Sequence, residues 1–290
     1  MGNKKELKKA IIIFILPCIA VLLFVSILPL IYSVYLSLHN WSIQTRMSPP
    51  FVGLRNFINV LTNMRFWGSL GVIGKIGGIS ICIELFLGLG FALILNSKLL
   101  EKGKGFFRVV NLIPMMITPL VVGYLSRLLF DATTGPINHL LGRNIDWLSS
   151  STITPLVVIL TDVWEWTPFV ALILLAALQS MPDEPYEAAA IDGASSLKVF
   201  RYITLPGILP AILIAIFLRL IDLVRMFDVP YILTHGGPGT TTEFTSIYIY
   251  LTGFKNFNLS TAATMSWILL VIVILIGQGF LKLLTSYRGD

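Results

Sequence analysis

Long runs of apolar residues alternate with short polar segments along the chain, at about 10–38, 68–97, 107–130, 154–181, 206–232 and 262–285. A helix needs about 20 residues to cross roughly 30 Å of hydrocarbon, and each run is long enough. No loop between the runs is long enough to form a separate soluble domain. The pattern therefore predicts an all-α fold, a single polytopic membrane domain over residues 1–290 with six transmembrane helices.

Composition and charge agree with this prediction. Hydrophobic residues make up 56% of the chain and charged residues 12%, whereas soluble domains carry roughly 25% charged residues. The formal net charge is +6, and the basic residues gather near both termini and in the loops 98–108 and 182–206. The positive-inside rule then predicts a multi-pass protein of the cell membrane with both termini cytoplasmic. The basic residues flank membrane lipid and do not indicate nucleic-acid binding.

Motifs for catalysis or energy conversion are missing from the sequence. The phosphate-cradling pattern G-x-x-x-x-G-K-[ST] does not occur. His39, His139 and His235 stand singly, while Cys18 and Cys82 lie inside apolar runs, so no metal site or disulfide framework is indicated. We therefore expect no cofactor, no metal and no catalytic activity.

The segment 182–206 has a helical pattern of its own. Asp183 fits an N-cap, the alanines 188–190 favour a helix, and Gly193 supplies a turn with φ > 0. A second amphipathic helix follows Ser195 or Ser196 and reaches Pro206, where the next span opens. On this pattern alone two interpretations stay open: a connecting hairpin at the membrane surface, or a small alanine-faced helix that lies in a cleft of another protein.

The same segment carries a family resemblance. Glu187-Ala188-Ala189, Gly193 and Ile203-Thr204-Leu205-Pro206 together resemble the EAA loop of permease subunits of ABC importers. In that family the loop forms a coupling helix that docks into a groove of the ATPase subunit. The resemblance implies that the cytoplasmic coupling residues here are Glu187, Ala188, Ala189, Asp192, Gly193, Ala194, Phe200 and Pro206.

Three further segments resemble the binding-protein-dependent carbohydrate branch of this family, which includes maltose, oligosaccharide and glycerol-phosphate permeases. They are 103–114, 162–169 and 227–239. The resemblance implies half of a pathway for a sugar or oligosaccharide that an external solute-binding protein delivers. It also implies a second, homologous permease subunit and two ATP-binding subunits, which hydrolyse the ATP.

Two other classes of protein compete with this interpretation. A secondary, ion-coupled transporter would show inverted repeats with matching broken segments, and none is apparent. An intramembrane enzyme would need paired catalytic groups at membrane depth, for which Asp162 and Glu165 are the candidate pair.

Polar and aromatic residues share one face of the fourth apolar run. Asp162, Glu165, Trp166 and Phe169 follow helical spacing. Carboxylates accept hydrogen bonds from sugar hydroxyls and aromatic rings stack on sugar C–H faces, so these four are candidates for the substrate pathway. The alternative is structural: an interfacial aromatic belt, with Asp162 or Glu165 paired to Arg127.

The fifth run carries charges of alternating sign every three residues, which makes each a helical neighbour of the next: Arg219, Asp222, Arg225 and Asp228. We assign Phe227, Asp228 and Tyr231 to the substrate pathway and the segment from Arg219 to Arg225 to structural pairing with neighbouring helices. In the second run, Lys75 and Glu84 lie on opposite sides of the helix, so each needs a partner elsewhere.

Overall fold

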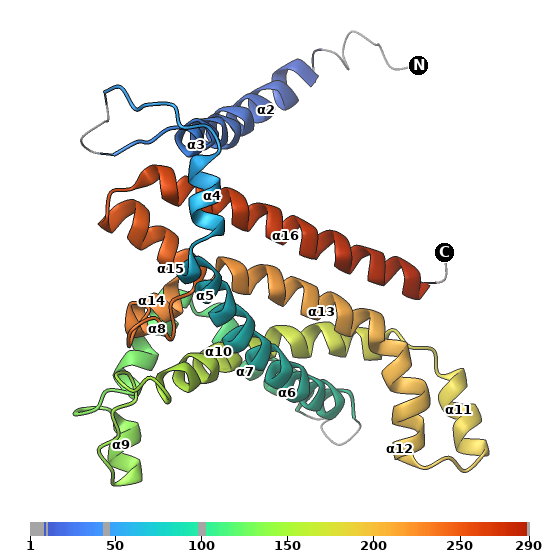
Figure 1. Ribbon diagram of the computed structural model, residues 1–290. Helices are drawn as coiled ribbons and strands as arrows, with labels where there is room; N and C mark the ends of the chain where they lie inside the picture. Colours follow the sequence, from blue (N-terminus) through green and yellow to red (C-terminus); the bar gives the residue numbers. More distant parts are fainter. Residues whose placement is uncertain (1–8, 10, 43–46, 98–102, 289–290) are drawn as a thin grey trace. The chain divides into compact units, whose positions relative to one another are not determined.

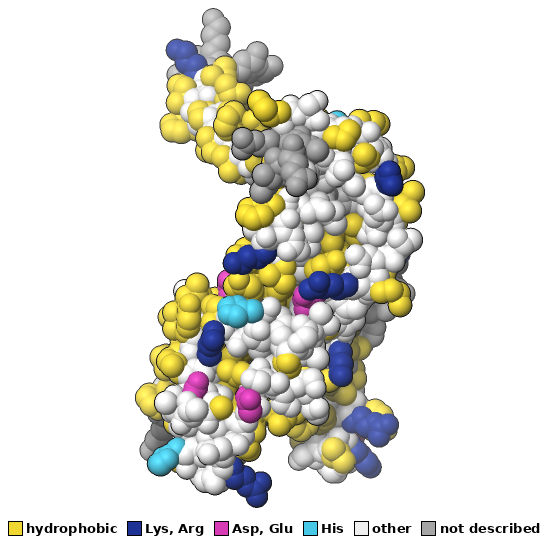
Figure 2. All heavy atoms as spheres, turned by 60° about the vertical axis from the view of Figure 1, so that its left-hand side comes forward, with side chains coloured by type: hydrophobic (Ala, Val, Ile, Leu, Met, Phe, Trp, Pro, Cys, Tyr) yellow, Lys and Arg dark blue, Asp and Glu magenta, His cyan; other side chains and the backbone are white. Residues whose placement is uncertain are grey.

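The computed structural model describes residues 9, 11–42, 47–97 and 103–288, with side chains described as far as Lys282. The fold is all-α, as predicted: in these ranges the extended backbone pairs only at an isolated bridge between His39 and Phe51. Contacts divide the chain into one unit of residues 1–66 and 249–272 and another of residues 67–248 and 273–290. On the face shown in Figure 2, hydrophobic side chains are spread over the surface, and basic and acidic side chains lie singly or in small groups among them.

The first unit is built around a helix that runs from Ile11 to Leu38 and leaves its apolar surface uncovered. Its parts are two π-helical stretches, Ile11–Ile15 and Leu23–Ile27, and the helices α2 (Leu16–Leu22) and α3 (Leu28–Leu38). This unit also contains α4 (Arg55–Leu61), the π-helical stretch Leu251–Lys255 and the first part of α16 (Leu259–Arg288).

Polar side chains fix the internal packing of the first unit. Asn56 donates through Nδ2 to the carbonyl oxygens of Ser37 and His39, at 2.8 and 3.0 Å. Trp267 on α16 donates through Nε1 to the hydroxyl oxygen of Ser33 on α3, at 3.1 Å. These bonds satisfy polar groups that would otherwise be costly in an apolar environment.

The second unit holds most of the remaining helices (Figure 1). In chain order these are α5 (Met64–Val72), which begins in the first unit, a π-helical stretch (Ile73–Gly77), α6 (Gly78–Asn96), α7 (Lys104–Met116), α8 (Pro119–Leu129), α9 (Pro136–Leu141), α10 (Thr154–Gln179), α11 (Glu184–Ile191), α12 (Ser196–Val199), a π-helical stretch (Phe200–Thr204), α13 (Leu205–Arg225), α14 (Asp228–Thr234) and α15 (Thr245–Tyr250), which ends in the first unit.

Helices α6 and α10 form the centre of the second unit and lie side by side (Figure 1). Gly88 permits this close approach, because a Cβ there would lie 2.8 Å from Cγ1 of Val170 and 3.1 Å from the backbone nitrogen of Ala171. Small residues at helix contacts are typical of membrane proteins, in which association depends on packing. Ala92, Leu174 and Ile208 extend the core toward α13.

The apolar run 107–130 is two helices in the structure. α7 and α8 meet at a bend of 91°. Ile117 and Thr118 between them have extended backbone, with ψ of 138° and 141°. Proline disfavours helical backbone in the residue before it and lacks an N–H of its own, so Pro119 begins a new helix in a new direction.

The run 206–232 also differs from a simple span, at both of its ends. Helical backbone is continuous from Ser196 to Arg225, and α13 begins within it at Leu205 with Pro206 in its first turn. The π-helical stretch Phe200–Thr204 directly before it is the local irregularity that accommodates the proline. At the other end Met226 is non-helical, with ψ of 123°, and α14 starts afresh at Asp228.

By length and composition, five of the described helices can cross a membrane, or six when the bent pair of α7 and α8 counts as one span.

Candidate functional site

Arg219 of α13 lies at the centre of an ion-pair cluster inside the second unit. Its Nε donates to Oε2 of Glu84 at 2.7 Å, and its Nη2 to Oε1 of Glu84 at 2.9 Å. The same Nη2 donates to both oxygens of Asp162 at 2.9 Å, and Nη1 donates to Oδ2 of Asp222 at 2.8 Å. Because Glu84 lies on α6 and Asp162 on α10, the planar guanidinium ties three helices together.

This cluster decides several of the sequence expectations. Structural pairing of Arg219 with neighbouring helices is found, and Glu84 has its partner on another helix. Pairing of Asp162 with Arg127 is wrong, because Arg219 engages both Asp162 oxygens while Nη1 of Arg127 donates to the carbonyl of Ile232 at 3.1 Å.

Glu165, one turn along α10 from Asp162, has a different environment. Glu165 is only 1% exposed, and its Oε2 has no hydrogen-bond partner in the described part of the chain. A buried carboxylate oxygen with a free lone pair is costly, and it is ready to accept a hydrogen bond from a hydroxyl group.

Trp166 and Phe169 stand beside this carboxylate on α10, and both are half-buried. The Cζ of Arg219 lies 4.8 Å from the ring centroid of Trp166. The Phe169 ring meets the indole edge-on, at 5.9 Å between centroids and 86° between planes. The two rings form an aromatic corner on α10 that directly follows Glu165 in sequence, so this helix carries both kinds of group that a sugar ring contacts.

The other predicted pathway residues lie around the helix break after Arg225. The prediction that four charges of alternating sign follow one another on a single helix is wrong for Asp228. This residue begins α14, whereas Arg219 lies on α13. Phe227 and Tyr231 stack, with 4.8 Å between their centroids. Asp228 is exposed.

The glycine-rich segment after α14 forms a braced turn. The hydroxyl of Thr242 donates to the carbonyl of Gly237 at 2.7 Å, and the Gly236 N–H donates to the hydroxyl oxygen of Thr234 at 3.1 Å. Gly236 and Gly239 have φ of 93° and 62°, which glycine adopts without strain.

A second braced turn joins α8 to α9. The backbone N–H and hydroxyl groups of Thr133 and Thr134 all donate to one carboxylate oxygen of Asp131. These bonds favour the ionised form and hold the pKa of the Asp131 carboxyl well below its usual range.

The hairpin of α11, Gly193 and α12 has the predicted geometry at its turn. Gly193 has φ of 66°. The N–H of Ala194 donates to the carbonyl of Ala189 at 2.9 Å, and that of Gly193 to Ala190 at 3.2 Å. These two bonds are those of a Schellman cap. Asp183 and Ser195 occupy the N-cap positions, but neither side chain makes a capping hydrogen bond.

Side-chain contacts hold the base of the hairpin, whereas the residues at its turn are exposed. The hydroxyl of Tyr186 on α11 donates to Oγ1 of Thr204 at 3.2 Å, and Gly207 leaves room for Met181. Ile191 and Leu197, on either side of the turn, are 87% and 76% exposed. Glu187, Ala188, Asp192 and Pro206 are also exposed, whereas Ala189 is buried, and Ala194 and Phe200 are half-buried.

The ion-pair cluster was only partly visible in the sequence. Charge spacing marked Arg219 and Glu84 as residues that need partners, but nothing local named those partners. The buried hydrogen bond between the Ser69 and Thr245 hydroxyls, at 3.0 Å, gave no signal at all.

Apolar helices of membrane-crossing length, a buried charge cluster among them and an exposed hairpin are typical of a membrane transport protein. The family model "Binding-protein-dependent transport system inner membrane component" matches residues 85–285. The chain belongs to this family. It is a permease subunit of an ABC importer, a transport protein and not a catalytic enzyme, and the ion-coupled alternative has no support.

Relatives of known name agree with this assignment. The chain is 42% identical over 268 residues to "Probable ABC transporter permease protein y4oQ" of Sinorhizobium fredii, covering 91% of this chain and 86% of the relative. It is 39% identical over 242 residues to "Trehalose/maltose transport system permease protein MalF" of Thermococcus litoralis, covering 82% and 81%.

A chain in a crystal structure of a bacterial ABC transporter for the acidic polysaccharide alginate has a similar fold. The TM-score is 0.82, with 21% identity over 97% of this chain and 98% of that one.

Proposed function

We propose that this permease carries a neutral saccharide of trehalose or maltose size, delivered by an external solute-binding protein. The observation that carries the proposal is the aromatic corner of Trp166 and Phe169 beside the unsatisfied Glu165 oxygen. The 39% identity to a trehalose/maltose permease supports it.

The proposed pathway residues are Glu165, Trp166, Phe169, Phe227, Asp228 and Tyr231. Glu165 would accept hydrogen bonds from sugar hydroxyls, and the rings would stack on the sugar C–H faces. Both oxygens of Asp162 accept hydrogen bonds from Arg219, so in this proposal Asp162 would position Trp166 through that guanidinium.

The proposed coupling element is the exposed hairpin. With the termini and the hairpin on the cytoplasmic side, α11 and its Glu187, Ala188 and Ala189 would dock into a groove of an ATP-binding subunit. That partner would cover Ile191 and Leu197, which would account for the high exposure of two large apolar side chains in this chain alone. The complete importer would contain a second permease subunit and two ATP-binding subunits.

Transport follows as alternating access. Closure of the ATP-binding subunits would move the hairpin, and the helix continuous from Ser196 to Arg225 would carry that movement to the charge cluster. The chain itself would hydrolyse nothing.

The test is uptake of radiolabelled trehalose and maltose by proteoliposomes that contain the complete transporter and its binding protein. We expect uptake that requires internal ATP, the binding protein and this chain together. Uptake driven by a proton or sodium gradient without ATP would overturn the transport mechanism. Uptake of only non-saccharide ligands would overturn the substrate class while leaving the family assignment intact.

A further inference from the structure

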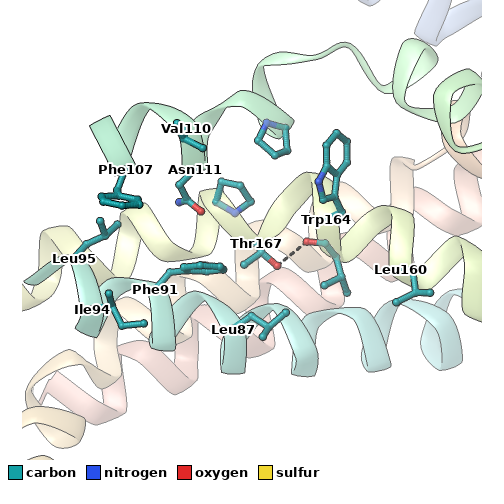
Figure 3. Close-up of a pocket in the computed structure, with 13 residues that line it drawn as sticks. Leu87, Phe91, Ile94, Leu95, Phe107, Val110, Asn111, Leu160, Trp164 and Thr167 are labelled. Atoms are coloured by element: carbon teal, nitrogen blue, oxygen red, sulfur yellow. Dashed lines mark hydrogen bonds between the residues drawn. The ribbon is translucent and has the colours of Figure 1, made fainter. Parts of the chain in front are cut away.

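The outer side of α6, α7 and α10 carries a groove that the transport proposal does not use (Figure 3). Its volume is about 660 Å³, and Leu87, Phe91, Phe107, Val110 and Trp164 are among the side chains that line it. Most of its lining is apolar. A shallower groove adjoins it, and Leu87, Phe91 and Ile94 of α6 line both, so these residues form a ridge between two apolar channels.

Two cations of α7 are close in sequence to the residues that line one end of the groove. Phe107 and Leu95 lie together at this end in Figure 3, and Phe107 is flanked in sequence by Lys104 and Arg108, one helical turn apart on α7. Neither cation has an acidic partner in the described part of the chain, and the buried Nε of Arg108 has no hydrogen-bond partner there.

A polar group follows one turn farther into the groove. Asn111 lies about 4.5 Å beyond Arg108 along the helix axis, at 1.5 Å per residue. Its amide points into the space between α7 and the other two helices (Figure 3). No hydrogen bond to the Asn111 amide is found in the ranges that the structure describes. Along α7 the order is therefore two cations, a free amide and an apolar channel.

We propose that this surface binds one anionic phospholipid. The phosphate group pairs with Lys104 and Arg108, the Asn111 amide donates to an ester carbonyl, and the two acyl chains lie in the two channels on either side of Phe91 and Ile94. Charge complementarity selects the occupant, because basic sites between transmembrane helices on the cytoplasmic side hold anionic headgroups. The two channels match a lipid with two chains.

The experiment uses the complete transporter in nanodiscs of phosphatidylcholine doped with a photoreactive phosphatidylglycerol, whose acyl chain bears the reactive group. Cross-linked peptides are mapped by mass spectrometry. We expect labelling within α6, the second half of α7 and the middle of α10. A phosphatidylcholine probe of the same chain length should label these peptides several-fold less.

Two variants test the two halves of the site. The double variant Lys104→Gln, Arg108→Gln should reduce labelling by phosphatidylglycerol by about tenfold or more, because it removes both charges that pair with the phosphate. The double variant Arg55→Gln, Arg143→Gln removes the same charge from exposed positions that line neither channel and should leave labelling unchanged. Val110→Trp, which narrows the channel, should also reduce labelling.

Three outcomes would overturn the proposal. Equal labelling by the two lipid probes, unaffected by the Lys104 and Arg108 variants, would mean that ordinary bulk lipid covers an apolar surface. Competition by soluble glycerol phosphate or inorganic phosphate as strong as that by lipid would mean an anion site. Protection of all three helices by a helix of another subunit would mean that protein fills the groove.

Discussion

The buried charges of the second unit differ, residue by residue, in how far each is compensated. Arg219 donates to three carboxylates and is fully enclosed by them, whereas Glu165 keeps an oxygen that nothing in the described chain satisfies. The first arrangement holds helices together, and the second leaves free binding capacity. Substitutions at these two positions should therefore have effects of different kinds.

Replacement of Arg219 by Met should destabilise the protein strongly. Glu84 and Asp162 would remain buried without their cation, and breaking a buried pair in this way costs about 3–5 kcal/mol. Thermal unfolding of the detergent-solubilised complex measures the effect as a lower midpoint. The triple variant Arg219→Met, Glu84→Gln, Asp162→Asn should recover much of the loss. The exposed Arg225→Met serves as control, and an equal loss there would contradict the argument.

Glu165→Gln should impair transport without impairing assembly. The amide keeps the shape of the carboxylate but loses a charged acceptor, and hydrogen bonds to charged groups are roughly twice as strong as neutral ones. We expect an uptake KM for the binding-protein-loaded sugar raised by about tenfold or more at a normal yield of complex. Asp146→Asn, in an exposed loop, is the control. If Glu165→Gln and Asp228→Asn both left uptake kinetics unchanged, the sugar would contact the partner permease instead.

At the scale of helices, two contacts depend on a glycine: the turn between α11 and α12 and the packing of α6 against α10. The physical reason for the glycine differs between them. Gly193 has positive φ, and the space around it is open. Gly88 has ordinary helical backbone, but three atoms of Val170 and Ala171 would lie within 3.1 Å of a Cβ added there. Backbone strain should therefore decide the outcome at the hairpin, and steric contact should decide it between α6 and α10.

Gly193→Val should uncouple the transporter. A β-branched residue at φ of 66° costs roughly 1–2 kcal/mol or more, so the Schellman cap opens and α11 tilts. We expect normal membrane levels, reduced recovery of the ATP-binding subunit in pull-downs and uptake near background. Gly193→Asn is the matched control, because asparagine tolerates this conformation and the added atoms enter open space. Full transport by the valine variant would mean that the hairpin is not the coupling element.

Gly88→Ala should push α6 and α10 apart. The new Cβ would lie 2.8 Å from Cγ1 of Val170, and overpacking of this kind costs about 1–3 kcal/mol. The unfolding midpoint of the complex should fall. Gly90→Ala, two residues on in the same helix, meets no heavy atom within 4 Å and should keep or raise the midpoint. A lower midpoint for Gly90→Ala alone would reverse this reasoning.

Local signals and tertiary contacts explain which elements could be predicted from the sequence. Gly193 was predictable because a helix C-cap depends on its own neighbours in the chain. The elbow between α7 and α8 and the break at Met226 were not, although Pro119 marks the first of them. A proline permits a helix to continue, bend or stop, and packing decides among these.

At the scale of the whole molecule, the proposed importer divides transport and ATP hydrolysis among its subunits. The sequence lacks a phosphate-cradling loop, so the purified chain alone should neither bind nor hydrolyse ATP. A coupled phosphate-release assay on this chain, and on the complete complex with its ATP-binding subunits, measures the difference. Activity should appear only in the complex. Hydrolysis by the isolated chain that survives removal of contaminants would contradict the assignment of roles.

Family and architecture were accessible from the sequence for a physical reason. Membrane insertion requires apolar runs of a fixed minimal length, and the exposed hairpin keeps its motif on contiguous residues. The candidate pathway was less accessible, since Asp162 and Glu165 have the same side-chain chemistry at helical spacing and differ only in what Arg219 reaches.

The uninterrupted helix from Ser196 to Arg225 has a thermodynamic consequence. At 1.5 Å per residue, about 35 Å of helical path separates the start of α12 from Arg219. Figure 1 shows that α12 is turned away from the axis of α13, so the two helices form a bent lever, or crank. Free-energy coupling between two binding sites is reciprocal. If nucleotide closure at one end of the crank changes the affinity for sugar at the other, sugar must change the affinity for nucleotide by the same factor. In the proposed importer, sugar binding would then change nucleotide affinity through the same helix that carries the movement caused by nucleotide binding.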